Sequence, residues 1–441
     1  MAGHLFRPVL GVLVALTAVA VLAVPHWYVW RRLVRDTTRG PGPARRAGTA
    51  VLIAGPVLMV AALAAERGGA PFWLQRALGW PGFLWMALAM YLLLAVLAGE
   101  LLRPPLRRFT ERRVPGGTAV RQHEESVRPE GPEQAVREAV RETVTKTPRA
   151  PGPAPEAGAA RPAPAAAPSR RLFVSRVVAG AAATAAVGTV GYGTYGVLRG
   201  PRVKRVTVPL AKLPRSAHGF RIAVVSDIHL GPLLGRGFAQ KVVDTINATQ
   251  PDLIAVVGDL VDGSVKNLGP AAAPLAGLRA RHGSYFVTGN HEYFSGAAQW
   301  VQEVRRLGIH PLENARTELP GFDLAGVNDL QGESEGQGPD FGRALGDRDT
   351  ARACVLLAHQ PAQIHQAVRH GVDLQLSGHT HGGQLWPGNL IAAAANPTVA
   401  GLARYGDTEL YVSRGAGAWG PPTRVGAPSD ITVVELASRS S

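Results

Sequence analysis

The residues best suited to chemistry are aspartate, asparagine and histidine side chains that recur just after short apolar runs in the second half of the chain. The single cysteine, Cys354, is not among them and lies inside an apolar run. Oxygen and imidazole ligands without thiolate suit Mn, Fe, Zn or Ni, and they disfavour a structural thiolate zinc site. The candidate metal ligands are Asp227, His229, Asp259, Asn290, His359, His379 and His381.

The elements that would position these side chains are short runs rich in β-branched and aliphatic residues, which are typical of buried strands. Open α/β sheets gather their ligand-binding loops at the carboxyl ends of the strands, so residues remote in sequence can meet there. We therefore expect the polar clusters to converge on one place. The expected strands are 221–226, 253–257, 284–287, 353–358 and 374–376, each followed directly by one of the clusters.

The order of the clusters resembles the five sequence blocks of the calcineurin-like metallophosphoesterase family, in its bacterial membrane-anchored and exported branch. The resemblance covers about residues 203–438. It implies an α/β fold, a two-sheet β-sandwich flanked by helices. It also implies hydrolysis of a phosphomonoester or phosphodiester by attack of a metal-bound hydroxide. The blocks are Asp227-x-His229, Gly258-Asp259, Gly289-Asn290-His291-Glu292, His359 and Gly378-His379-Thr380-His381.

The same resemblance implies two divalent or trivalent metal ions with separate ligand sets. Asp259 would bridge both ions, because two cations about 3.5–4 Å apart repel each other unless anionic oxygen lies between them. One ion would be held by Asp227, His229 and His381, and the other by Asn290, His359 and His379.

Two further residues, His291 within a block and Asp262 three residues after Asp259, have expected roles beside the ligands. By resemblance His291 is not a ligand and would protonate the leaving oxygen, a task for a side chain that titrates near neutral pH. Asp262 would hydrogen-bond a ligand histidine or His291. A local explanation for Asp262 also stands, since Asp beside Gly263 is common in turns.

The first half of the chain has a different composition, with apolar runs long enough to cross a bilayer at 9–30, 49–65 and 81–102 and a weaker Ala/Gly-rich run at 174–198. We expect Pro81 to occupy the first helical position of the third span. The expected organisation is a membrane domain of about three transmembrane helices at 1–102, a cytoplasmic disordered linker at 103–171, a fourth helix or anchor at 172–199, and the metallophosphoesterase domain at 200–441.

The net charge of +15 belongs to this first half, because Ala217–Ser441 contains 17 Lys and Arg against 21 Asp and Glu. No nucleic-acid partner is therefore expected. The first and third loops are strongly basic and the second is nearly neutral, which places the first and third in the cytoplasm and the domain 200–441 on the extracytoplasmic face of the cell membrane. The segment 169–174 resembles a twin-arginine export signal, although two arginines closing a cytoplasmic loop would look the same.

The leading interpretation is a multi-pass membrane phosphoesterase whose anchored position favours a lipid-linked or envelope substrate in contact with membrane lipids. The alternative is a catalytically idle metal-binding domain that serves as a membrane sensor or scaffold. The complete ligand set and His291 favour the enzyme, because an idle relative would be expected to lose at least one of them.

Overall fold

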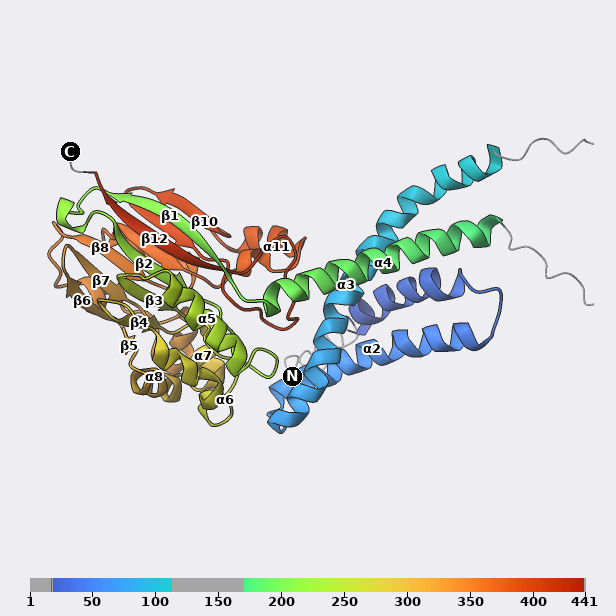
Figure 1. The fold of residues 1–441 in the computed structure, drawn as a ribbon, viewed down its shortest axis with the longest axis horizontal. Coiled ribbons are helices and arrows are strands. Elements are labelled where there is room, and N and C mark those ends of the chain that lie inside the picture. The colour runs from blue at the N-terminus through green and yellow to red at the C-terminus, as the bar shows by residue number, and fades with distance from the viewer. Residues whose placement is uncertain (1–16, 18, 113–169, 440–441) are drawn as a thin grey trace, which may run out of the picture.

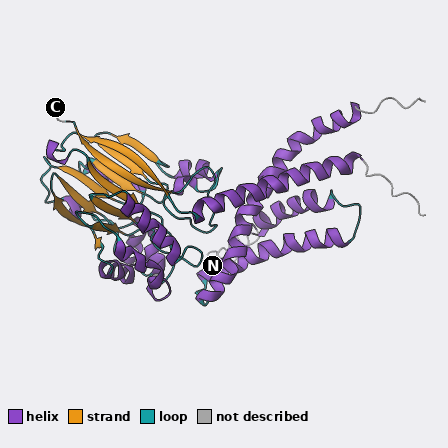
Figure 2. Cartoon of the chain, in the orientation of Figure 1, coloured by secondary structure: helices purple, strands orange, loops and turns teal. Residues whose placement is uncertain are grey.

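The structure is a computed structural model that describes residues 17, 19–112 and 170–439. A bundle of long helices extends away from a domain built on two β-sheets (Figure 1). All strands of the described residues belong to that domain, as the colouring in Figure 2 shows. The predicted architecture, an α/β two-sheet domain flanked by helices and preceded by apolar helices, is confirmed.

Three helices in the described part of the chain are long and apolar enough to cross a membrane, namely Pro43–Arg67, Phe72–Leu106 and Arg171–Leu198. The expected span at 9–30 lies partly outside the described residues, and its residues 19–30 are helical. Most of the expected linker, 113–169, also lies outside them. The helices of this region are the π-helical turn η1 (Arg31–Arg35), α2 (Pro43–Arg67), α3 (Phe72–Arg112) and α4 (Arg170–Leu198).

The expected bounds of the third span are wrong. Helix α3 begins at Phe72, and Pro81 lies well inside it rather than at its first position. The helix also continues through Pro104 and Pro105. A proline removes one backbone hydrogen bond, but neighbouring helices and local adjustments make this tolerable in apolar helices. The loop between the second and third apolar helices, α2 and α3, therefore comprises only residues 68–71.

Helices α2 and α3 pack closely because a glycine stands at their contact. A Cβ on Gly82 of α3 would lie 2.6 Å from both the Ala62 Cβ and the Leu58 carbonyl oxygen of α2. Small residues of this kind let apolar helices approach until their backbones are in van der Waals contact. The hairpin formed by α2 and α3 is thus a tightly packed unit.

The two sheets of the domain have six strands each. The first runs in the order β1 (Arg202–Leu210), β12 (Asp430–Ser438), β2 (Phe220–Val225), β3 (Leu253–Val257), β4 (Ser284–Val287) and β5 (His310–Pro311). The second runs in the order β10 (Gly401–Tyr405), β11 (Thr408–Val412), β9 (Leu374–Ser377), β8 (Ala353–Leu357), β7 (Phe322–Gly326) and β6 (Ala315–Leu319).

Helices cover the outer faces of the sheets, and short 3-10 turns connect several of the elements. The α-helices are α5 (Arg236–Ala248), α6 (Val265–Ala272), α7 (Asn290–Ser295), α8 (Ala297–Arg306), α9 (Phe341–Leu345), α10 (Ile364–Arg369) and α11 (Gly388–Ala395). The 3-10 turns are η2 (Arg215–Ala217), η3 (Ala273–Gly277), η4 (Leu330–Glu335), η5 (Pro361–Gln363) and η6 (His381–Gly383).

The strand directions bring the polar loops together. Strands β2, β3 and β4 pair in parallel in one sheet, and β7, β8 and β9 pair in parallel in the other. The carboxyl ends of parallel neighbours lie at the same edge of a sheet. The loops after β2, β3, β4, β8 and β9 are the ones that carry the candidate ligands.

Three cores of buried apolar side chains stabilise the domain. Side chains of both sheets, such as Val224, Phe322 and Leu376, form the core between the sheets. A second core joins the outer face of the first sheet to α5, α6 and α8 and includes Trp300, and a third lies under α9 and α10. Each fully buried side chain of this size contributes about 1.5–3 kcal/mol, so burial strongly stabilises the frame behind the loops.

The helices and the domain are in direct contact. The Tyr91 hydroxyl of α3 donates to the Trp386 carbonyl oxygen at 2.8 Å, and the hydroxyls of Thr194 on α4 and Thr423 lie 2.7 Å apart. Phe72, the first residue of α3, packs against the core that contains Trp300. The short connection between α2 and α3 is therefore placed beside the domain.

We predict that replacing Trp300 will destabilise the domain strongly. Its side chain is fully buried, and its Nε1 donates to the Gly263 carbonyl oxygen at 2.8 Å. Trp300→Ala should cost about 3–5 kcal/mol and lower Tm in calorimetry of the detergent-solubilised chain. Trp300→Phe should cost less, since it loses the hydrogen bond but keeps most of the volume. Leu402→Ala, at a side chain that is 42% exposed, is the control. Equal effects of Trp300→Ala and Leu402→Ala would contradict the assigned core.

Candidate metal centre

The candidate ligands stand on loops with an unusual backbone. Eight non-glycine residues in the described part of the chain have positive φ, and five of them are candidate ligands. This left-handed conformation costs about 1–2 kcal/mol per residue for ordinary side chains, and such outliers cluster at functional sites. The fold therefore holds these side chains in place at the expense of local strain. The five are Asp227, His229, Asp259, His379 and His381.

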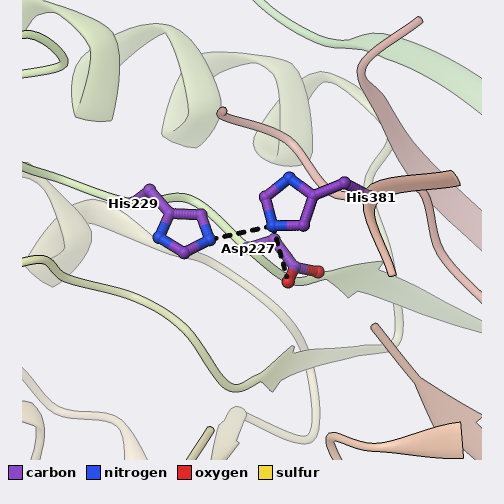
Figure 3. Close-up of side chains that lie close together, drawn as sticks. All are labelled: Asp227, His229 and His381. Carbon is purple, nitrogen blue, oxygen red and sulfur yellow. Dashed lines mark hydrogen bonds and ion pairs between the residues drawn. The ribbon is translucent and has the colours of Figure 1, made fainter. Parts of the chain in front are cut away.

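Asp227, His229 and His381 form the first group of possible ligands (Figure 3). The Nε2 atoms of the two histidines lie 3.0 Å apart, and His381 Nε2 lies 3.4 Å from Asp227 Oδ1. One ligand atom from each residue lies within 4.8 Å of the others, although the residues come from loops after two different sheets.

Asp259, His359 and His379 form the second group by the same measure. Asp259 Oδ2 lies 3.1 Å from His359 Nε2. Asn290 joins this group, because its Oδ1 lies 3.0 Å from His379 Nδ1. The structure thus brings together every residue that the sequence suggested as a ligand.

Asp259 stands between the two groups. Its Oδ2 lies 3.8 Å from His229 Nε2 of the first group as well as close to His359 of the second. Its Oδ1 accepts a hydrogen bond from the His291 backbone N at 2.9 Å. A single buried carboxylate therefore faces the ring nitrogens of both sets.

The hydrogen bonds of the histidines fit metal binding. His359 Nδ1 donates to the Val257 carbonyl oxygen at 2.9 Å, which leaves the buried His359 Nε2 facing Asp259 Oδ2. His229 Nδ1 donates to Asp262 Oδ1 at 2.9 Å, which leaves Nε2 facing the cluster. Fixing one ring nitrogen so that the other presents its lone pair is how proteins orient histidine ligands. The clustered donors are compatible with a binuclear metal site.

Electrostatics keeps two of the histidines neutral. Burial is the main cause that lowers the pKa of His379 to about 4, with the nearby His359 as the next contribution. Burial also holds the pKa of His381 well below its usual value, helped by His229 and Arg424. A neutral imidazole is the form that binds a metal ion.

Asp262 connects a candidate ligand to His291. Its Oδ1 lies 2.9 Å from His229 Nδ1 and 2.7 Å from His291 Nδ1. Burial opposes the protonation of His291, but the hydrogen bond and charge of Asp262 outweigh it and raise the pKa of His291 to about 9. Asp262 therefore favours the protonated form of His291 beside the cluster.

Glu292 has a structural role that the sequence did not reveal. Its buried carboxylate accepts hydrogen bonds from the backbone N of Asp259, Leu260 and Gly289 at 2.9, 2.8 and 2.7 Å. These bonds tie the loop after β3 to the loop after β4. Its place in the Gly-Asn-His-Glu block was visible in the sequence, but its partners are remote and could not be read there.

Arg424 contacts the candidate ligand His381, but the sequence did not predict a role for it. Its guanidinium donates to the carbonyl oxygens of Gly417, His381 and Ala427, and its Nη2 lies 3.2 Å from His381 Nδ1. Burial lowers the pKa of Arg424 to about 10, so it remains charged. It lies outside the five blocks, and no local pattern marks it.

A cavity of about 720 Å³ opens beside the cluster. Its lining includes the candidate site residues Asp259, Asn290 and His291, and the aromatic residues Phe294 and Trp419 beside them. Leu63, Glu66 and Arg67 at the end of α2 also line it. The hairpin of α2 and α3 thus supplies a wall of the cavity.

This fold and this set of side chains define a class of metal-dependent phosphoester hydrolases. Residues 220–383 match the calcineurin-like phosphoesterase family. An uncharacterized metallophosphoesterase of Helicobacter pylori strain J99 is 35% identical over 276 residues, which cover 62% of this chain and 74% of that protein. The chain belongs to the calcineurin-like metallophosphoesterase family.

Two other relatives differ in how much of them is matched. A zebrafish (Danio rerio) protein described as a transmembrane protein with metallophosphoesterase domain is 39% identical over 259 residues, 56% of this chain and 59% of that protein. The metallophosphoesterase YkuE of Bacillus subtilis, also uncharacterized, is 30% identical over 284 residues, 61% of this chain and 98% of that protein. With its three apolar helices, the chain is a membrane protein.

We predict that Gly378→Ala will weaken metal binding. A Cβ at this position would overlap with Asp227 Oδ2 and Ser226 Oγ, so it would displace a candidate ligand. Loss of one well-placed ligand or its support typically lowers metal affinity about 10–100-fold. Metal content of the purified chain and the Tm increase on adding Mn²⁺ measure the effect. Gly235→Ala is the control, since nothing lies within 4 Å of its Cβ. Unchanged metal content in Gly378→Ala would contradict the close packing of this position against a metal ligand.

Proposed function

We propose that the chain is a membrane-anchored phosphoesterase that uses two metal ions, chosen from Mn, Fe, Zn or Ni, to hydrolyse a phosphomonoester or phosphodiester. The observation that carries this proposal is the position of Asp259 between two groups of ligand-type side chains. Asp227, His229 and His381 would hold one ion, Asn290, His359 and His379 the other, and Asp259 both.

Metal ions bound in this way would polarise the phosphoryl oxygens, activate a water molecule and stabilise the charge that develops on the leaving oxygen. The protein itself holds the side chains around this site in fixed orientations. Asp262 orients His229 and His291 together, and Glu292 fixes the loop that carries Asp259. Such orientation by surrounding groups is what places reacting atoms within reach of each other.

His291 is the residue that we propose as the general acid. Its Nδ1 is occupied by Asp262, and it lines the cavity with its side chain 15% exposed. A charged imidazole in this position can give its second ring proton to the leaving oxygen of the ester. The rings of Phe294 and Trp419 stand edge-on to it at 5.5 and 5.7 Å, which limits its access to water.

The residues that line the cavity favour a substrate with an apolar part, such as a lipid-linked phosphoester of the cell envelope. Phe294 and Trp419 are 66% and 49% exposed, although large aromatic side chains are normally buried. Leu63 adds an apolar side chain from α2, and Arg67 adds a positive charge that suits a phosphate. The substrate would therefore meet the metal centre next to the end of a membrane helix.

We also propose that the domain faces the extracytoplasmic side. The loop between η1 and α2 lies at the end of the bundle remote from the domain (Figure 1). That end carries Arg31, Arg32 and Arg35. Basic residues near the ends of membrane helices favour the cytoplasmic side, so the opposite end with residues 200–439 is assigned to the outside. The export reading of residues 169–174 agrees with this orientation.

The direct test uses the full chain in lipid nanodiscs. Metal content is measured together with turnover of nitrophenyl monoesters and diesters after loading with Mn²⁺, Fe²⁺, Zn²⁺ or Ni²⁺ in turn. We expect about two ions per chain and hydrolysis that chelation abolishes. A folded chain that binds the ions but turns over neither ester would instead indicate a metal-binding membrane sensor or scaffold.

We predict that His291→Ala will keep both metal ions and lower kcat by about 10²–10⁴-fold, the usual contribution of a positioned proton donor. The effect should be smaller for esters with a good leaving group, because these need less protonation. Parallel kinetics with nitrophenyl and alkyl esters measure the difference. His365→Ala, an exposed histidine on α10, is the matched control. Full activity in His291→Ala would remove this residue from the reaction.

We predict that Arg67→Ala will raise KM for a long-chain alkyl phosphodiester and for a small one alike, because both carry the phosphate that the guanidinium would contact. Loss of one charge-assisted contact to the phosphate corresponds to about tenfold or more in affinity. Steady-state kinetics of the nanodisc-embedded chain with hexadecyl and methyl nitrophenyl phosphodiesters measure both values. The control is Arg76→Ala on α3, an exposed arginine that does not line the cavity. If both arginine variants behaved alike, the end of α2 would have no part in substrate binding.

A further inference from the structure

A second cavity lies between the end of α4 and the segment that leads into β12. Its volume is about 370 Å³. It is separate from the metal centre, because none of the candidate ligands lines it. The residues that matter for the argument are Tyr192, Tyr195, Arg199, Arg202 and Ser429.

The lining of this cavity is positively charged. Arg199 and Arg202 contribute two guanidinium groups, and that of Arg199 lies 6.0 Å from the centroid of the Tyr195 ring. No ion pair joins either of them to a residue that the structure describes. No Asp or Glu is among the lining residues of the described chain. Arg424 also lines the cavity, but its side-chain donors are already used by the carbonyl oxygens of Gly417, His381 and Ala427. Two cationic groups are thus left to meet an anion.

Ser429 gives a second, independent indication of a ligand. Its residue is only 5% exposed, and its Oγ is buried without a hydrogen-bond partner in the part of the chain that the structure describes. Leaving a buried polar group unsatisfied costs about 1–3 kcal/mol, so native structures rarely tolerate it without a partner such as a ligand or water. A hydroxyl can donate to an oxygen of a bound group.

The position of the cavity indicates where the ligand comes from. The apolar part of α4 ends at Leu198, directly before Arg199. Tyr192 and Tyr195, in the last two turns of this helix, are 75% and 62% exposed. Exposed tyrosines at the end of a membrane helix mark the depth of the lipid headgroups. Guanidinium groups at this depth can bind the phosphate of an anionic headgroup.

We propose that this cavity binds the phosphate of an anionic lipid headgroup, with Arg199, Arg202 and the Ser429 hydroxyl as its donors. The lipid tails would lie along the exposed face of α4 near Tyr192 and Tyr195. Arg199 and Arg202 flank the connection between α4 and β1, so the bound headgroup would attach this connection to the membrane surface.

The test measures lipid binding to the full chain in detergent by native mass spectrometry, which does not depend on catalytic turnover. The probes are short-chain phosphatidylglycerol, phosphatidylcholine of the same chain length, and inorganic phosphate. We expect retention of phosphatidylglycerol in preference to phosphatidylcholine. In the double variant Arg199→Ala with Arg202→Ala the apparent affinity should fall at least about tenfold, as expected for lost charge-assisted contacts.

Two further variants keep the result interpretable. Ser429→Ala removes one hydroxyl and should lower the affinity by about two- to tenfold with little effect on folding. Arg205→Ala removes the same charge at an exposed position outside the cavity and should bind like the parent chain. Equal binding of the two phospholipids, or equal loss in Arg205→Ala and the double variant, would overturn the proposal. Retention of inorganic phosphate without lipid preference would replace the lipid by a free anion.

Discussion

The structure depends on keeping one carboxylate, that of Asp259, between two sets of imidazole rings. The residue is buried and has a left-handed backbone, and three loops from two sheets must meet around it. Burial of a carboxylate and a left-handed backbone are each unfavourable on their own. Glu292 compensates by accepting the backbone hydrogens of this loop and of its neighbour, and the parallel strands below bring the loop ends together. The apolar cores behind the sheets are what allow this strained arrangement to persist.

The membrane helices take part in the same arrangement. The end of α2 lines the cavity beside the candidate metal ligands, and α4 contacts the segment that contains Arg424. Arg424 in turn contacts the backbone and ring of His381. The helices therefore contact the cavity beside the candidate ligands and the segment that holds His381, in addition to anchoring the domain.

The sequence predicted the strands well because they are local patterns, and it placed the polar clusters directly after them. Leu253–Val257 and Ser284–Val287 have the predicted bounds, and the polar residues follow directly. What it could not predict depends on partners far away in the chain. Glu292 acts on a loop more than 30 residues earlier, and Arg424 reaches His381 over 43 residues. The sequence also could not predict that α3 continues through Pro81. A proline inside a helix is tolerated when neighbouring helices pack against it, and that packing is not a local property of the sequence.

The shared wall of the cavity has a consequence for work on the soluble half of the molecule. A fragment that begins near residue 200 would lack Leu63, Glu66 and Arg67, and Phe72 would no longer cover the core beneath it. Its cavity would lose the residues that α2 supplies, and the side chains of Phe294 and Trp419, already 66% and 49% exposed, would no longer face a neighbouring helix end. The cavity beside the candidate ligands is thus a property of the undivided chain.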